Sequence, residues 1–373
     1  MIPFNKPCAI GVEEAAINEA ISSSKLAGNG PFGKKCSDWL ENRLSCERAL
    51  LTPSCTAALE MTALLTEVGT GDEVIMPSYT FVSTANAFAI RGAKIRFVDV
   101  TPDTLNIDPG KIEAAITERT KAVVVVHYAG IACDMDAIMD IAYRHDLWVI
   151  EDAAQALLST YKGKPLGSIG HFGTISFHET KNYTCGEGGA LIINDSSAVE
   201  RAEIIQEKGT NRSQFKKGMV DKYTWRDIGS SFLLSDLNAA YLYVQLQHAD
   251  SINENRIQSW RQYEDTLKTV DSIAIPYVPD HCKHNAHMFY IKTKDENERD
   301  QLIRFLYENN IMAVSHYVPL HTSHAGEKYG EFIGMDQYTT TESARLLRLP
   351  LYYGIGEEAI DHVVSTIQTF YQP

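Results

Sequence analysis

Short apolar runs alternate with segments of helical periodicity through the first half of the chain. The helical spacing covers residues 12–24, 35–49, 55–68, 83–91, 109–115 and 135–145. The apolar runs cover residues 73–79, 94–100, 121–129, 147–154, 174–177 and 190–193. Strands that are apolar on both faces and separated by helices are typical of a mainly parallel sheet covered on both sides. The pattern therefore predicts a large α/β domain over residues 1–245.

The pattern changes after residue 235. Residues 235–270 keep an apolar stripe at helical spacing and contain neither proline nor glycine, which predicts one long helix that joins two domains. Beyond it, strand-like runs cover residues 272–278, 288–293 and 312–318, and helical segments cover residues 298–309, 341–347 and 357–371. We predict a smaller C-terminal α+β domain over residues 246–373.

Composition and charge narrow the class of partner. A chain of 373 residues is long for a single core. Its 34 basic and 48 acidic side chains give a formal net charge of -14, which argues against nucleic acid or an anionic membrane as the main partner. No apolar run is long enough to span a membrane, and the N-terminus does not have the pattern of a secretion signal. Seven cysteines without a CxxC pair predict neither a disulfide framework nor a zinc ribbon, so we expect a cytoplasmic protein.

A glycine-rich loop near the N-terminus resembles a nucleotide-binding fingerprint. Gly28, Gly30 and Gly33 have the spacing G-x-G-x-x-G. That fingerprint requires a buried strand before it, whereas the preceding residues, ISSSKLA, are polar, and Pro31 lies inside the loop. We interpret the segment as a plain loop before a helix over residues 32–44.

The strongest candidate for chemistry is Lys181, within TISFHETKNYTCGEGGALIIND at residues 174–195. An apolar run delivers the lysine into a turn, and a glycine cluster follows that lets the backbone approach a bulky ligand. A lysine in a partly desolvated site can lose its proton and act as an amine nucleophile, so it is a candidate Schiff-base lysine. A solvent-exposed lysine in a hairpin turn is the alternative for this stretch alone.

Three other stretches converge on the same chemistry. Small residues at 54–58 begin the helix over residues 55–68, and free N–H groups there could cradle a phosphate, although an ordinary N-cap is the alternative. Asp152 ends an apolar strand, where α/β folds bind ligands, and could keep a pyridine nitrogen protonated rather than being merely solvated. Phe81 follows another strand and could stack on a ring or pack in the core.

These motifs together carry a resemblance to a known family. EDAAQ, SFHETKN and GEGGA stand in the order and spacing of the DegT/DnrJ/EryC1/StrS sugar aminotransferases, and the similarity covers essentially the whole chain. The resemblance implies fold type I of the pyridoxal 5'-phosphate (PLP) enzymes, an α/β, aspartate aminotransferase-like fold. Within the family, LLTPSCTA, MPSYTFVSTANAF, FHETKNYT and EKGTNRSQF are similar to enzymes that aminate C4 of TDP-4-keto-6-deoxy-D-glucose for enterobacterial common antigen, a surface glycan.

Carried over by position, the resemblance implies roles for individual residues. Lys181 holds PLP as an imine, and Asp152 pairs with its pyridine nitrogen. The other implied cofactor contacts are Gln155 to the ring hydroxyl, Phe81 to the ring face, and Thr56, Ala57 and Ser176 to the phosphate. Many members add an asparagine from a second subunit, and here Ser231 stands in its place while Leu233 replaces a neighbouring arginine.

Substrate contacts are a further hypothesis. Residues 207–218 gather four basic side chains in an acidic protein, and we expect Arg212 to bind the nucleotide diphosphate. His316, Tyr317 and His321 resemble the family segment that lines the sugar pocket. The alternatives are a solvated loop and structural histidines. His281, His284 and His287 are spaced like metal ligands, but zinc would add nothing to this chemistry, so no metal is expected.

The implied substrates are a TDP-linked keto sugar and L-glutamate, and the implied assembly is a homodimer with shared active sites. A 3-aminotransferase, or an enzyme acting on another nucleotide-linked keto sugar, is the nearest alternative. A PLP-dependent sugar dehydratase usually has histidine in place of Lys181. A protein that only senses or scaffolds a nucleotide sugar would show no turnover.

Overall fold

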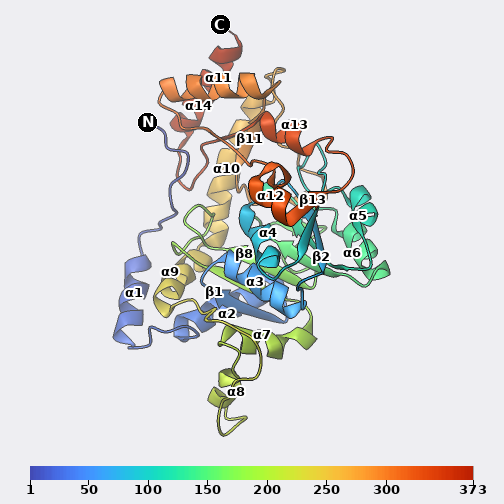
Figure 1. Ribbon diagram of the computed structural model, residues 1–373. Helices are drawn as coiled ribbons and strands as arrows, with labels where there is room; N and C mark the ends of the chain where they lie inside the picture. The colour runs from blue at the N-terminus through green and yellow to red at the C-terminus, as the bar shows by residue number, and fades with distance from the viewer. Residues whose placement is uncertain (373) are drawn as a thin grey trace.

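An eight-stranded sheet forms the centre of the computed structural model, which describes residues 1–372 (Figure 1). In spatial order the strands are β1 (Arg48–Thr52), β9 (Gly189–Ile193), β8 (Phe172–Ser176), β5 (Trp148–Asp152), β4 (Thr120–Val126), β2 (Glu73–Pro77), β3 (Lys94–Val98) and β13 (Gly330–Phe332). Strand β9 is antiparallel to β1 and β8, and the other neighbouring pairs are parallel. The predicted mainly parallel sheet is confirmed.

The central strands are buried on both faces because helices cover both sides of the sheet. Alternate residues of β4 point to opposite faces, so Val123 and Val125 join one core while Ala122 and Val124 join the other. The first core is closed by α1 (Glu13–Ser22), α2 (Pro31–Leu44), α5 (Pro109–Ala115), α6 (Met135–Arg144) and α9 (Asp236–Gln247). The second is closed by α3 (Cys55–Leu65), α4 (Val82–Ala89) and α7 (Val199–Gln206).

A smaller α+β unit lies beyond this sheet and has its own core. Its antiparallel sheet has the order β11 (Phe289–Lys292), β14 (Leu346–Leu349), β12 (Val314–Ser315). The helices α10 (Ala249–Leu267), α11 (Glu296–Glu308) and α14 (Glu357–Tyr371) pack on it, and their buried side chains form a third core. The N-terminal segment runs from α1 up to this unit, where Ile2 bridges to Ile311 (Figure 1).

The remaining elements are short. They are β6 (Thr160–Tyr161), β7 (Lys164–Pro165) and β10 (Cys282–Lys283), which pair with one another, α8 (Arg212–Lys216), α12 (His324–Tyr329), α13 (Thr339–Ala344), and the 3-10 turns η1 (Tyr128–Gly130), η2 (Ser196–Ala198) and η3 (Leu320–Thr322). Among the helices of residues 1–372, none is long and apolar enough to cross a membrane.

Several predicted elements differ in the structure. The single helix expected over residues 235–270 is two helices, α9 and α10, because His248 leaves the helical conformation and its ring bonds to the carbonyl of Val244. Residues 48 and 49, expected at the end of a helix, begin β1. The helix expected over 341–347 ends at Ala344, and β14 follows. The strand expected over 272–278 is reduced to a bridge at Ala274.

The edge strand β13 also crosses the predicted domain boundary. It lies at residues 330–332, within the segment assigned to the small domain, yet it pairs in parallel with β3 of the large sheet. The neighbouring α12 packs against β13 and β3. Part of the C-terminal segment therefore belongs to the large sheet, because a strand completes its hydrogen bonds only beside another strand.

The glycine-rich loop before α2 packs against the start of α9. The carboxylate of Asp236 accepts hydrogen bonds from the N–H groups of Phe32 (3.2 Å) and Gly33 (2.7 Å), so it caps α2 from a distance. A Cβ at Gly30 would lie 2.5 Å from Cγ of Asp236, and one at Gly28 would lie 2.6 Å from Cβ of Leu233. The glycines thus permit close packing, and the helix end that a dinucleotide would need is occupied.

Asp236→Ala should lower the free energy of unfolding by about 3 kcal/mol, because two buried N–H groups lose a charged acceptor. Urea denaturation at fixed protein concentration measures this change. Asp38→Ala, on the exposed face of α2, is the matched control and should stay within about 0.5 kcal/mol. Equal losses in both variants would contradict the capping role of Asp236.

Candidate active site

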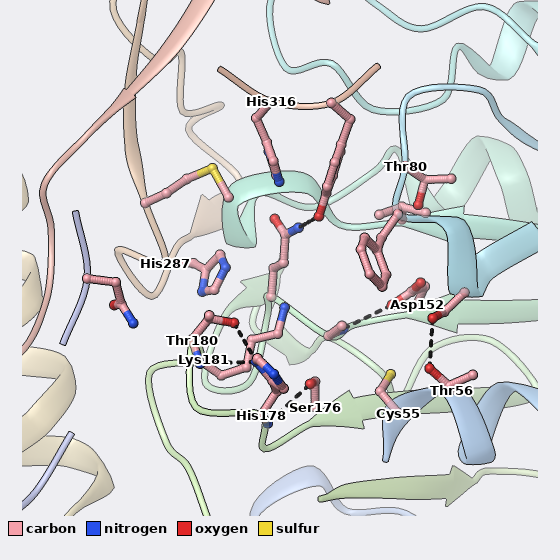
Figure 2. Close-up of a pocket in the computed structure, with 18 of the residues that line it drawn as sticks. Cys55, Thr56, Thr80, Asp152, Ser176, His178, Thr180, Lys181, His287 and His316 are labelled. Carbon is pink, nitrogen blue, oxygen red and sulfur yellow. Dashed lines mark hydrogen bonds between the residues drawn. The ribbon is translucent and has the colours of Figure 1, made fainter. Parts of the chain in front are cut away.

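A cavity of about 470 Å³ opens at the carboxyl ends of β5 and β8 (Figure 2). The first turns of α3 and α4 form its floor, and the loop after β8 carries Lys181 into it. Segments of the α+β unit close the opposite side, with Met288, His316 and Leu351 among the lining residues. This volume suits a small organic cofactor together with part of a substrate.

Lys181 lies in a turn between β8 and β9. Its N–H donates to the carbonyl of His178, while Phe177 N–H bonds to Gly188, so the turn is closed at its base. The residue is half-buried, but its amine lies inside the cavity, between Asp152 and His287 in the view of Figure 2. Burial lowers the pKa of Lys181, which increases the neutral amine fraction at neutral pH. The amine is thereby suited to attack a carbonyl and to accept a proton.

Asp152 is the last residue of β5 and is almost fully buried. Its Oδ2 accepts a hydrogen bond from the Thr84 hydroxyl (2.7 Å), and its Oδ1 accepts one from the Ala154 N–H (3.2 Å). Burial raises the pKa of Asp152, and these two bonds oppose the rise by favouring the carboxylate. No ion pair joins Asp152 to Lys181 in the described chain, so both groups face the cavity unpaired.

The preceding residue, Glu151, fixes the end of β5 from the other side. Its buried carboxylate accepts hydrogen bonds from the N–H groups of Gly167, Ile169 and Gly170 at 2.6–2.8 Å, and from His127 Nε2 at 2.9 Å. Successive strand residues point to opposite faces, so anchoring Glu151 also orients Asp152 toward the cavity.

The first turns of α3 and α4 meet at the floor of the cavity. The Thr56 hydroxyl donates to the Ser83 hydroxyl (2.7 Å), and Ser176 at the end of β8 lines the same region. The N–H groups of Cys55 and Thr56 have no hydrogen-bond acceptor within residues 1–372. A Cβ on Gly189 would lie 2.4 Å from the Cys55 nitrogen, so only glycine lets β9 pass behind this turn. Free N–H groups and hydroxyls at a helix start form a phosphate site.

Aromatic groups form the wall of the cavity opposite the sheet. Phe81 lies at its edge, 55% exposed, with its ring centroid 6.1 Å from that of Tyr317. Gln155 accepts a bond from the Ala129 N–H (2.7 Å) and donates to the Tyr317 hydroxyl (3.3 Å). His316 bonds through Nδ1 to the Tyr128 hydroxyl (3.1 Å). Phe81, Gln155, His316 and Tyr317 thus come together at the cavity that holds Lys181.

Four of the predicted contacts are not brought to this cavity. Ala57 does not line it, because its N–H already donates to the Ser54 hydroxyl that caps α3 (3.0 Å). His321 also lies outside it, since Nδ1 bonds to Ser78 (2.7 Å) and Nε2 pairs with Asp336 (3.1 Å). Within one chain the structure therefore contradicts the predicted contacts of Ala57 and His321, because the Ala57 N–H and the His321 ring already have other partners.

Ser231 and Arg212 are likewise remote from the cavity of their own chain. Ser231 is exposed and bridges to Glu207, and Arg212 pairs with Glu207 at 3.4 Å. The helix α8, which begins at Arg212, projects from the lower end of the molecule, away from α4 and α12 (Figure 1). Contacts from either residue to a ligand would require a second subunit, so they stay predictions.

The three histidines spaced like metal ligands take up separate positions. His284 stacks on Trp260 with ring centroids 4.3 Å apart, and burial lowers its pKa to about 4. His287 bonds through Nδ1 to the side chain of Asn182 (3.0 Å) and lines the cavity. His281 packs against Tyr161. Within the described residues, no three His, Cys, Asp or Glu side chains gather as a metal site.

Several lining residues were missed by the sequence reasoning. Ser83 lines the cavity and Thr84 bonds to Asp152; both lie in the first turn of α4, within three residues of Phe81, which was a usable signal. Phe4, Asn5, His287 and Arg348 also line the cavity. Nothing local in the sequence marks these residues, since they come from both ends of the chain.

Comparison with known proteins identifies the type of site. The family model of the DegT/DnrJ/EryC1/StrS aminotransferases matches residues 8–368. The chain belongs to this family. It is 33% identical to the spore coat polysaccharide biosynthesis protein SpsC of Bacillus subtilis, over 98% of this chain and 96% of that protein.

Solved structures agree with this assignment. The aminotransferase TlmJ from Streptoalloteichus hindustanus has a TM-score of 0.91 and 30% identity, over 99% of this chain and 98% of that one. The PLP form of the putative sugar aminotransferase Spr1654 from Streptococcus pneumoniae has a TM-score of 0.91 and 26% identity, over 100% and 98%. The protein is therefore a PLP-dependent sugar aminotransferase of fold type I, as predicted.

The residues of the cavity fit PLP. The free N–H groups of Cys55 and Thr56, with three nearby hydroxyls, provide an anion cradle for its phosphate, and Asp152 provides a buried carboxylate for its ring nitrogen. Lys181 provides the amine that would hold its aldehyde. When bound, PLP supplies an electron sink for the bond changes of amino-group transfer.

Thr84→Val should shift the acid limb of the pH–rate profile upward by about one pH unit, because it removes a hydrogen bond that favours the Asp152 carboxylate. Asp152 then stays protonated to higher pH, and activity dependent on its charge is lost earlier as pH falls. The measurement is kcat/KM against pH. Thr62→Val, whose buried hydroxyl bonds only within α3, is the matched control, and an equal shift in both would contradict the role of Thr84.

Proposed function

We propose that this protein transfers the amino group of L-glutamate to C4 of TDP-4-keto-6-deoxy-D-glucose, which yields TDP-4-amino-4,6-dideoxy-D-galactose for surface glycan synthesis. The observation that carries the transferase part is the shared cavity of Lys181 and Asp152, built around a phosphate cradle. The choice of sugar rests on the segments around Thr56, Phe81 and Lys181, which are similar to those of enzymes with this substrate.

In this proposal Lys181 does the proton transfers. With the cofactor bound, Nζ of Lys181 would accept the proton from the α-carbon of the donor, and the cofactor would supply the electron sink. The lowered pKa of Lys181 favours this base at neutral pH. Asp152 keeps its negative charge opposite the cofactor nitrogen, and Thr84 orients it. In the second half-reaction, Lys181 transfers protons in the opposite direction, toward the aminated sugar.

The other predicted contacts complete the proposal. Phe81 would cover the cofactor ring, Gln155 would bind its hydroxyl, and Thr56 and Ser176 would hold the phosphate. His316 and Tyr317 line the aromatic wall and would contact the sugar. A homodimer would bring Arg212 and Ser231 of a second copy to the mouth of each cavity. The segment between Arg212 and Ser231 has exposed apolar side chains, which support this assembly. They are Phe215, Met219, Tyr223, Trp225 and Ile228.

Stepwise titration of the purified holoenzyme tests the function. Glutamate should remove the visible absorbance of Lys181-bound PLP, and the TDP-4-keto sugar should restore it, because the two half-reactions are independent. NMR of the product should show the amine on C4. Lys181→Ala is the control and should show no cycle. Amination at C3, or recovery only with another nucleotide-linked keto sugar, would replace the proposed substrate.

Arg212→Glu should raise the KM for the nucleotide sugar by about tenfold or more while leaving the KM for glutamate almost unchanged, because only the sugar substrate carries a diphosphate. Steady-state kinetics with each substrate varied in turn measures both constants. Arg304→Glu, on the exposed face of α11, is a control for the change in net charge. Equal rises in the two constants would exclude a specific diphosphate contact.

A further inference from the structure

An arginine in the cavity has no hydrogen-bond or ion-pair partner among residues 1–372. Arg348 lies on β14 and lines the cavity together with Lys181 and His316. Its side chain makes no hydrogen bond or ion pair with any of residues 1–372, and its Nε is buried without an acceptor. Burying a guanidinium without a counter-ion is costly, so such groups are normally paired or hydrogen-bonded. Arg348 is half-buried, and an anionic group of a ligand would supply the missing partner.

The register of β14 sets the direction of this side chain. Leu347 and Leu349 join the core of the α+β unit, so Arg348 between them points to the opposite face, toward the cavity. Arg348 is opposite Tyr290 in β11 and opposite Val314 in β12, which places it on the central strand of the small sheet. A central strand is held on both sides, so the position of Arg348 is well determined.

The N-terminal segment holds the guanidinium in place. The ring of Phe4 lies under it, with 4.6 Å between the guanidinium carbon and the ring centroid. The segment is tied to the α+β unit on both sides of Phe4. Ile2 exchanges backbone hydrogen bonds with Asn310 (2.7 Å) and Met312 (3.0 Å), and the Lys6 amine lies over the Tyr352 ring. A stacked guanidinium keeps its N–H groups in a plane that can meet a carboxylate with two bonds.

The chemistry of the two substrates decides which anion suits this position. An α-amino acid carries its carboxylate one bond from the carbon that bears the reacting amine. In a 4-keto nucleotide sugar, the diphosphate is separated from C4 by the sugar ring. The phosphate of PLP fits the cradle at the start of α3, on the sheet side of the cavity. A cation that shares the cavity with Lys181 therefore suits the donor carboxylate better than either phosphate group.

We propose that Arg348 binds the α-carboxylate of the amino donor, and that Phe4 of the N-terminal segment is the positioning residue that holds it. This inference rests on the proposed function only in requiring an α-amino acid as donor, whichever amino acid that is. Arg348 makes a substrate contact, and Phe4 acts through it. The first residues of the chain thereby become part of the active site, although they are far in sequence from β14.

Arg348→Met tests the inference in the isolated donor half-reaction. The concentration of glutamate that converts half of the bound cofactor should rise about 100-fold, because two charge-assisted bonds are lost. Half-saturation by the TDP-4-keto sugar, measured on enzyme loaded with pyridoxamine 5'-phosphate, should change less than threefold. Arg348→Lys keeps the charge but not the planar guanidinium. Its half-saturating glutamate concentration should lie between those of the wild type and Arg348→Met. Arg304→Met is the matched control and should alter neither value.

Binding without turnover gives an independent readout. Glutarate, a dicarboxylate that lacks the amine, should bind the wild-type holoenzyme in a calorimetric titration and lose at least tenfold in affinity in Arg348→Met. Phe4→Ala should raise the half-saturating glutamate concentration about tenfold. Phe4→Tyr should keep the wild-type value because the ring is kept. Tyr329→Ala removes an equivalent surface stack, on Lys328, and should have no effect.

The outcomes separate this inference from the proposed function. If the wild-type enzyme fails to react with glutamate but reacts with another amino acid, glutamate is not the donor. Arg348 is then tested with that amino acid. A rise confined to the sugar half-reaction, or an equal rise in both, would overturn the inference. So would unchanged glutarate binding in Arg348→Met. If Arg348→Met fails to fold, the Arg348→Lys and Phe4 variants give the same comparison.

Discussion

The site depends on keeping a half-buried lysine and a buried aspartate in one cavity without an ion pair between them. Asp152 is engaged by Thr84 and by a backbone N–H, and Lys181 enters from a closed turn on the next strand. Because neither Asp152 nor Lys181 forms an ion pair within residues 1–372, both can interact with a ligand. Burial opposes both charges, which lowers the pKa of the lysine and raises that of the aspartate.

The order of the strands in the large sheet makes this arrangement possible. Strands β5 and β8 are parallel neighbours, so their carboxyl ends meet at one edge and bring Asp152 and Ser176 together. Glu151 anchors the edge through four hydrogen bonds, and the start of α3 faces it with unpaired N–H groups. The α+β unit then supplies the aromatic wall and Arg348. One side of the cavity thus carries the groups that fit the cofactor, and the aromatic wall and Arg348 lie on the other side.

Sequence patterns predicted the parts of the fold that follow from local periodicity. The apolar runs over residues 121–129 and 147–154 became β4 and β5, because strands covered on both faces must be apolar throughout. The pattern failed where one residue redirects the chain. His248 divides the expected long helix, and residues 346 and 347, expected at the end of a helix, begin the central strand of the small sheet. Tertiary pairing decides such boundaries, because strand hydrogen bonds are not local.

The sequence by itself determined the large sheet, the family, the cofactor and the candidate roles of Lys181 and Asp152, since these depend on short motifs with fixed order. Only the tertiary structure decided which other groups surround them. It joined Thr84 to Asp152, gave His321 partners outside the cavity, and placed Phe4 under Arg348. The physical reason is that a cavity wall is assembled from segments distant in the chain, and no local pattern records which of them meet.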